Sequence, residues 1–167
     1  MSVIQNLILD PRFKAGKWHN VNSTVTPIPA RDAVNVSNTS DDRDSFMKVI
    51  LPDVSPYRGV SMTFACSLIA IDGGANECVN GLLFVHGDGW QANASDGGTA
   101  KVGRKTLQFT LPSDATSLEL RLYAPSERGT FQWWRPMLTR TVDYQRMLNG
   151  IDGQPMDYFD GDTMPWQ

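Results

Sequence analysis

The stretch VSMTFACSLIAID, residues 60–72, alternates large apolar side chains with small or polar ones. The first set comprises Met62, Phe64, Cys66, Leu68 and Ala70, and the second comprises Ser61, Thr63, Ala65 and Ser67. Successive side chains of a β-strand point to opposite faces, so a period of two places these sets on opposite sides. The stretch therefore predicts a strand with one buried face.

The same alternation recurs along the chain. TLQFTLP (106–112) would point Leu107, Phe109 and Leu111 inward. SLELRLYAP (117–125) would point Leu118, Leu120 and Leu122 inward, and Glu119, Arg121 and Tyr123 outward. TFQWWRPML (130–138) is a further strong candidate, and the weaker ones are NLILDPRF (6–13), STVTPIP (23–29), DAVNVSN (32–38), SFMKVIL (45–51) and VNGLLFVHGDGW (79–90). Pro27, Pro29 and Pro136 suit sheet edges, bulges or strand ends.

Eight or nine strands with frequent turn signals predict an all-β fold, an antiparallel β-sandwich of the jelly-roll kind. We expect residues 60–72 and 79–90 to pair as a hairpin with its turn near Gly74. Only VDYQRMLNG (142–150) has the pattern of a short helix, with Asn149 and Gly150 as its stop. The predicted division is a β-sandwich domain over 1–141 and a C-terminal extension over 142–167.

The charge and the hydropathy of the chain argue against two classes of protein, those that bind nucleic acid and those that insert into a membrane. The 167 residues carry 15 basic and 18 acidic side chains, a formal net charge of −3. Without a basic excess, nucleic-acid binding is not expected. No run approaches the ~18 apolar residues of a membrane helix, so we expect no membrane insertion. The first residues lack the pattern of a signal peptide, which predicts synthesis in a cytoplasm.

The two cysteines, Cys66 and Cys78, are predicted to be buried thiols, although a disulfide stays open. In the expected hairpin Cys66 would lie opposite Leu82, and that register disfavours a bond between the two sulfur atoms.

The sequence contains few of the motifs that are typical of enzymes or of metal-binding proteins. The histidines, His19 and His86, form no ligand pair, and no serine-elbow or phosphate-loop motif appears. Most carboxylates fall in turns, so the chain is predicted not to be an enzyme. Acidic clusters at Asp41, Asp42 and Asp44 and at Asp157, Asp160 and Asp162 do not follow an EF-hand pattern. We expect no cofactor and no metal site, with a structural calcium left open.

The tryptophans are more informative. They stand at positions 18, 90, 133, 134 and 166, and the adjacent Trp133 and Trp134 must point to opposite faces of a strand. Three roles are open for the aromatic residues: packing under loops, anchoring a protein interface, or stacking on a sugar ring. In the last case the candidate site residues are Trp90, Arg121, Tyr123 and one of Trp133 and Trp134.

Four stretches resemble a known family when taken in order. NLILDPRFKAGKW (6–18) is similar to the opening of galactose-binding-like domains of the carbohydrate-binding-module type, through Asn6, Leu7, Asp10, Pro11, Phe13, Gly16 and Trp18. GRKTLQFTLPSDATSLELRLYAP (103–125) looks like the penultimate hairpin of that family, and FQWWRPMLT (131–139) stands where its last strand stands. YFDGDTMP (158–165) resembles the segment that follows this domain in phage minor tail proteins.

The resemblance implies a galactose-binding-like jelly roll in a non-enzymatic minor tail protein of a phage tail tip or fibre. It implies a homo-oligomer in the virion, with other phage tail proteins and a cell-wall glycan of the host as partners. The alternative is a stand-alone carbohydrate-binding module. Arg135 and Pro136 stand where relatives often carry paired aspartates, so no calcium ligand carries over to that position. Tyr158, Phe159 and Trp166 would anchor the extension on the chain's own sandwich or on a neighbouring subunit.

Overall fold

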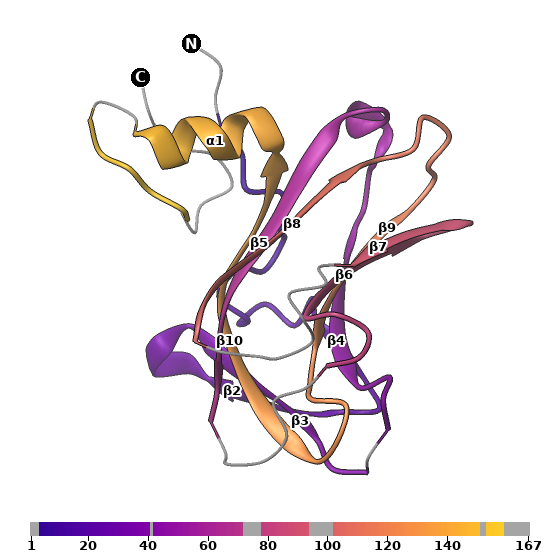
Figure 1. Cartoon of the computed structure of the whole chain (residues 1–167), viewed down its shortest axis with the longest axis vertical. Helices are drawn as coiled ribbons and strands as arrows, with labels where there is room; N and C mark the ends of the chain where they lie inside the picture. Colours follow the sequence, from indigo (N-terminus) through magenta and orange to yellow (C-terminus); the bar gives the residue numbers. More distant parts are fainter. Residues whose placement is uncertain (1–3, 41, 72–77, 94–101, 151–152, 159–167) are drawn as a thin grey trace.

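The computed structural model describes residues 4–40, 42–71, 78–93, 102–150 and 153–158. Two five-stranded antiparallel sheets form a β-sandwich, which confirms the predicted all-β class (Figure 1). The elements in chain order are β1 (His19–Val21), β2 (Thr24–Ile28), the 3₁₀ turn η1 (Pro29–Arg31), β3 (Ala33–Asn38), β4 (Phe46–Leu51), the 3₁₀ turn η2 (Ser55–Tyr57), β5 (Ser61–Ala70), β6 (Leu83–Gly87), β7 (Trp90–Asn93), β8 (Gly103–Thr110), β9 (Leu118–Tyr123), β10 (Gly129–Arg140) and α1 (Thr141–Asn149).

We name each sheet after its middle strand. The β9 sheet has the order β1-β4-β9-β6-β7, and the β10 sheet has the order β2-β3-β10-β5-β8. The core lies between them and takes one alternate set of side chains from every long strand. The predicted inward residues of 107–111 and 118–122 are all buried there, as are Met62, Phe64, Cys66 and Leu68.

Two expected strand pairings are wrong. β5 belongs to the β10 sheet and β6 to the β9 sheet, so residues 60–72 and 79–90 form no hairpin, and Gly74 lies outside the described residues. β8 and β9 likewise lie in different sheets and not in one hairpin. Alternation identifies the buried face of a strand, but two facing sheets bury the same pattern, so it does not identify the neighbouring strand.

The segment 6–13, expected as a β candidate, forms no strand. Its chain turns at Asp10, whose carbonyl accepts a hydrogen bond from the Phe13 N–H at 3.2 Å. The prolines lie where strand geometry tolerates them. Pro27 is in the edge strand β2. Pro136 lies in a bulge of β10, directly after Arg135, whose φ is 58°.

Helix α1 covers part of the outer surface of the β10 sheet. Figure 1 shows it directly after β10. Its Tyr144 and Met147 pack on Ile4, Ala65 and Met137 in a small second cluster. The helix ends at Gly150 (φ 95°), whose N–H bonds to the Met147 carbonyl, so the predicted stop is confirmed. No helix in the described ranges is long and apolar enough to cross a bilayer.

Both cysteines are free and buried, as predicted. Cys66 lies in β5 of the β10 sheet, and Cys78 lies just before β6, where its Sγ donates to the Gly81 carbonyl at 2.9 Å. The hairpin register that was expected to separate the two thiols does not exist, because β5 and β6 belong to different sheets.

Candidate functional site

The outer surface of the β9 sheet carries a group of charged side chains that strand geometry brings together. On β9, Glu119 and Arg121 alternate with buried leucines and therefore point away from the core, as predicted. In the strand register, Arg121 lies opposite Lys48 of β4 and Phe84 of β6, and Glu119 lies opposite His86 of β6. We call His19, Lys48, His86, Gln91, Glu119 and Arg121 the polar face; they come from all five strands of this sheet.

A charged network lies at the centre of the polar face. Lys48 Nζ is 3.0 Å from Glu119 Oε1, and Arg121 Nε is 2.5 Å from Glu119 Oε2. The side chains of Glu119 and Arg121 are only 14% and 16% exposed. Burial alone would raise the pKa of Glu119, but hydrogen bonds from Arg121 and Lys48 outweigh it and lower that pKa. The site therefore holds an ionised carboxylate flanked by two cations.

Aromatic rings lie under the guanidinium of Arg121. Its Cζ is 4.3 Å from the centroid of Phe46 and 5.0 Å from that of Phe84. The Tyr123 ring packs at 5.1 Å from Phe46, and its hydroxyl donates to Asp44 Oδ1 at 2.9 Å. Arg121 thus gives the polar face a flat, cationic patch on an aromatic floor.

Tyr123 points away from the leucine core, as predicted, but its ring is not exposed to solvent. The residue is 1% exposed, because Phe46, Phe84 and Arg121 surround its ring and Asp44 holds its hydroxyl. Burial raises the pKa of this phenol. Tyr123 supports the position of Arg121, because its hydroxyl oxygen accepts a hydrogen bond from Arg121 Nη1 at 3.3 Å.

The structure does not bring the predicted tryptophans to the polar face. Trp90 stacks on Phe109 across the sandwich, with ring centroids 6.1 Å apart and planes at 21°. Trp133 is in the core, where its indole N–H donates to the Tyr123 carbonyl at 2.9 Å. Trp134 is half-buried on the outer side of the β10 sheet. Trp133 and Trp134 thus occupy opposite faces, as predicted.

Lys48, Phe46, Phe84 and His86 were missing from the predicted site. The signal for two of them was in SFMKVIL, where the alternation that buries Met47 and Val49 points Phe46 and Lys48 to the other side. Their meeting with Arg121 depends on the pairing of β4 and β6 with β9, which a single strand pattern does not contain.

Residues 157 and 158 of the C-terminal extension lie on the chain's own sandwich, one of the two alternatives. Tyr158 packs against the small cluster under α1, and the guanidinium carbons of Arg104 and Arg135 are 5.8 and 5.1 Å from its ring centroid. Arg135 also bonds to the Asp157 carboxylate at 2.8 Å. Phe159 and Trp166, the other two predicted anchors, lie outside the described residues.

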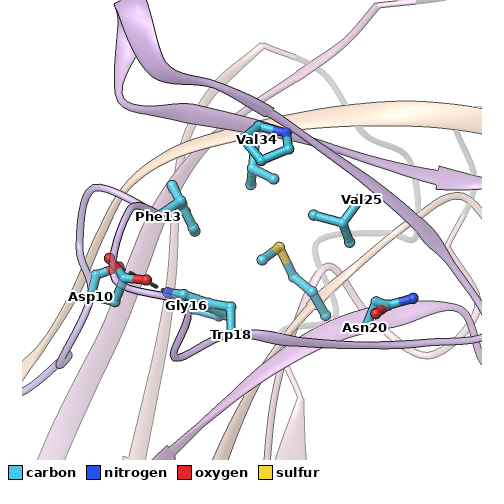
Figure 2. Close-up of a pocket in the computed structure, with 9 residues that line it drawn as sticks. Asp10, Phe13, Gly16, Trp18, Asn20, Val25 and Val34 are labelled. Atoms are coloured by element: carbon cyan, nitrogen blue, oxygen red, sulfur yellow. Dashed lines mark hydrogen bonds between the residues drawn. The ribbon is translucent and has the colours of Figure 1, made fainter.

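The opening motif forms a pocket at one edge of the sandwich, drawn in Figure 2. The Asp10 carboxylate accepts the N–H groups of Lys14 and Ala15 at 2.8 and 3.0 Å, and the Asp10 carbonyl accepts the Trp18 indole N–H at 2.8 Å. This loop holds Phe13 and Trp18 over an apolar floor and leaves a volume of about 210 Å³. The motif therefore has a structural role that is visible in its hydrogen bonds.

Within the described ranges, no group of three or more histidine, cysteine or acidic residues is placed to hold a metal ion. Asp41, Asp160 and Asp162 lie outside those ranges. Asp157 is paired with Arg135, and Asp44 with Tyr123.

Several solved structures with the same fold are carbohydrate-binding modules. The xylan-binding domain of family 22 matches with a TM-score of 0.58 and 16% identity over 81% of this chain and 95% of that chain. The chain has the carbohydrate-binding-module type of β-sandwich. The C-terminal family 22 module of Clostridium thermocellum xylanase 10B matches with a TM-score of 0.57 and 17% identity, again over 81% and 95%.

A two-module structure of the same Clostridium enzyme is also similar. Its CBM22-1 and GH10 modules, complexed with xylohexaose, match with a TM-score of 0.54 and 13% identity over 83% of this chain but 28% of that chain. The chain thus spans little more than a quarter of that structure. No family model and no curated protein matched the sequence.

Proposed function

We propose that this protein is a carbohydrate-binding module that holds glycan chains on the polar face of its β9 sheet. The observation that carries the proposal is the network of Lys48, Glu119 and Arg121, in which a carboxylate and two cations are gathered on the outer side of a sheet. The fold likeness to xylan-binding domains agrees with it, although identities of 17% or less bear on the fold alone.

The chemistry of the polar face suits sugar hydroxyl groups. A hydroxyl both donates and accepts, so it bonds to a carboxylate oxygen of Glu119 and to an N–H of Arg121 or Lys48 at the same time. His86 and Gln91 continue the polar surface along β6 and β7. Since the aromatic rings lie beneath Arg121, the contact is dominated by hydrogen bonds and not by stacking on an open ring.

The arrangement does not favour hydrolysis. Glycoside hydrolysis needs two carboxyl groups about 5–10 Å apart, one of them with a raised pKa. Here the one acid of the polar face, Glu119, has a lowered pKa and is held between two cations. Its geometry supports binding of a sugar more than protonation of a glycosidic oxygen.

Binding to purified polysaccharides tests the proposal. The wild-type chain and the variants Glu119→Gln and His86→Ala are titrated with soluble xylan, mixed-linkage β-glucan and purified Gram-positive cell walls. We expect saturable binding of the wild type to at least one of them and a loss of tenfold or more in affinity for both variants. Glu127→Gln removes an exposed carboxylate outside the polar face and should bind like the wild type.

No binding to any of these glycans would overturn the proposal, and so would binding that all the variants retain. Thermal unfolding of each variant, followed by circular dichroism, separates a lost binding group from a lost fold.

A narrower role rests on the sequence resemblance alone. Residues 158–165 resemble the segment after this domain in phage minor tail proteins, which supports attachment of a virion to host glycans by an oligomer. The fold likeness does not bear on this role. Light scattering of the full chain tests the oligomer, and immunolabelling of a phage particle tests the location.

A further inference from the structure

The outer surface of the β10 sheet has a groove of its own, on the opposite layer from the polar face. Its floor is formed by Thr63 of β5 and Thr106 and Gln108 of β8, and its wall by Thr141, Gln145 and Leu148 of α1. Its volume of about 410 Å³ falls in the range of about 300–1,000 Å³ that ligand sites occupy. The length of floor from residue 104 to 108 is roughly 13 Å, since a strand rises ~3.3 Å per residue.

The lining is rich in hydroxyl and amide groups. Thr141 Oγ1 lies 3.0 Å from Thr63 Oγ1 and 2.9 Å from Ser61 Oγ, so these hydroxyl groups are held in place by one another. Each hydroxyl has one donor and two acceptor sites, and a chain of hydroxyl groups therefore keeps acceptor sites for a ligand. Thr106, Gln108 and Gln145 are exposed and bring further donors and acceptors.

The charges at the end of the groove are engaged with the protein itself. Arg104 donates from Nη2 to the Asp157 carbonyl at 2.8 Å, and from Nη1 to Ser67 Oγ at 3.2 Å. The Asp157 carboxylate accepts a hydrogen bond from Arg135 at 2.8 Å. The Asp157 carboxylate offsets one of the two guanidinium charges, and both guanidinium groups donate hydrogen bonds within the protein. The other polar groups that line the groove are neutral hydroxyl and amide groups, which favour a neutral ligand.

An apolar strip runs along the same groove. Leu148 is 47% exposed on α1, and Tyr144 lines the wall one turn earlier. A ligand that suits this groove therefore combines many hydroxyl groups with C–H surfaces and has no net charge. A pyranose ring has these properties, since hydroxyl groups extend from a ring whose faces present C–H bonds.

We infer that this groove is a second saccharide site, which takes a short neutral oligosaccharide on the layer opposite the polar face. The inference does not depend on glycan binding at the polar face. Arg104 and Asp157, which are joined by a hydrogen bond, also line this groove.

Nuclear magnetic resonance of the ¹⁵N-labelled full chain tests the site. Xylohexaose and the hexamer of N-acetylglucosamine serve as neutral probes, and a neutral Gly-Ser peptide serves as the comparison. We expect saturable amide shifts in residues 104–108 and 141–148 with at least one saccharide and none with the peptide.

Thr106→Trp fills the groove from an exposed position, while Thr110→Trp places the same ring further along the same face of β8, outside the groove. In Thr106→Trp, the apparent affinity measured from the groove shifts should fall at least tenfold. In Thr110→Trp and in Glu119→Gln, the shifts and the affinity should stay as in the wild type. A thermal unfolding curve confirms that both tryptophan variants are folded.

The outcomes separate the two sites. Shifts confined to residues 119–123 and their neighbours would contradict the second saccharide site and support glycan binding at the polar face. Shifts confined to the groove would support the second saccharide site and contradict glycan binding at the polar face. Groove shifts that survive Thr106→Trp, equal shifts with the peptide, or no shift with either saccharide would each overturn the second site.

Discussion

Arg121 covers Phe46, with its guanidinium carbon 4.3 Å from the ring centroid, while its Nε donates to Glu119. One side chain therefore closes an aromatic cluster and orders the charged centre of the polar face. The planar guanidinium fits both tasks, because it stacks on a ring and keeps its N–H groups in the plane for hydrogen bonds. The interaction is specific to arginine and not merely to a positive charge.

Arg121→Lys should lower the free energy of unfolding by about 1 kcal/mol, because an ammonium group keeps the charge but loses the stacking on Phe46 and Phe84. Urea denaturation measures the change. Arg43→Lys is the matched control on an exposed loop and should stay within about 0.5 kcal/mol of the wild type. Equal effects for the two variants would contradict a structural role of the guanidinium plane.

Acid should weaken the fold partly through Glu119. Its folded pKa lies below the ordinary value of 4.5, so the carboxylate stabilises the fold above that value, and this contribution is lost as the pH falls through the folded pKa. Urea midpoints measured between pH 7 and pH 3 should therefore fall less steeply in Glu119→Gln than in the wild type. In Glu127→Gln the slope should match the wild type, and identical slopes for all three proteins would count against the network.

Trp133→Phe should lower the free energy of unfolding by about 2 kcal/mol, because the ring is fully buried and its N–H bonds to the Tyr123 carbonyl. Trp134→Phe, one residue later on the other face, should change it by about 0.5 kcal/mol or less. Chemical denaturation of the two variants side by side measures the difference. A larger cost at Trp134 would place β10 in the opposite register.

The inward faces of the strands could be predicted because alternation is a local property of each segment. The pairing of β5 with β8 and β10 could not, since residues 60–72 and 79–90 bury equivalent patterns in two different layers. The same limit applies to the polar face. Arg121 was found from its own strand, but the registers of β4 and β6 are needed to place Lys48 opposite Arg121 and His86 opposite Glu119.

Exposure was harder to predict than direction. Tyr123 does alternate with the buried leucines, yet Asp44 and Phe46 from another segment cover it, together with Arg121 of its own strand. Trp90, a candidate for stacking on a sugar ring, begins β7 and packs onto Phe109 instead. Side chains from other segments decide such cases, and those neighbours are known only once the layers are assembled.

Gly87→Ala should displace Trp90. A Cβ at this position would lie 2.2 Å from Trp90 Nε1 and 2.5 Å from the Ser117 carbonyl oxygen, closer than any stable contact. We expect a loss of about 1–3 kcal/mol in the free energy of unfolding and a red shift of tryptophan emission. Gly89→Ala meets no atom within 4 Å, so its cost is limited to the positive φ of 77° and its emission should not shift. An unshifted spectrum for Gly87→Ala would contradict this packing.

The two thiols should be unreactive in the native protein. Burial raises the pKa of both Cys66 and Cys78 to about 12, so almost no thiolate is present at neutral pH. A colorimetric thiol reagent should titrate neither residue under native conditions and both after denaturation. Rapid native reaction of one thiol would show that its segment opens locally. Cys78→Ser would then identify which residue had reacted.

The place of β10 also bears on how the protein folds as it is synthesised. β10 is the last strand of the described residues but the middle strand of its sheet, where it hydrogen-bonds to β3 on one side and β5 on the other. Until residues 129–140 have left the ribosome, the nascent chain can form the β2–β3 pair and the β5–β8 pair, but nothing joins them. Both pairs then present a bare, apolar edge, which makes folding late and slow and leaves the incomplete chain prone to pair with other unfinished chains.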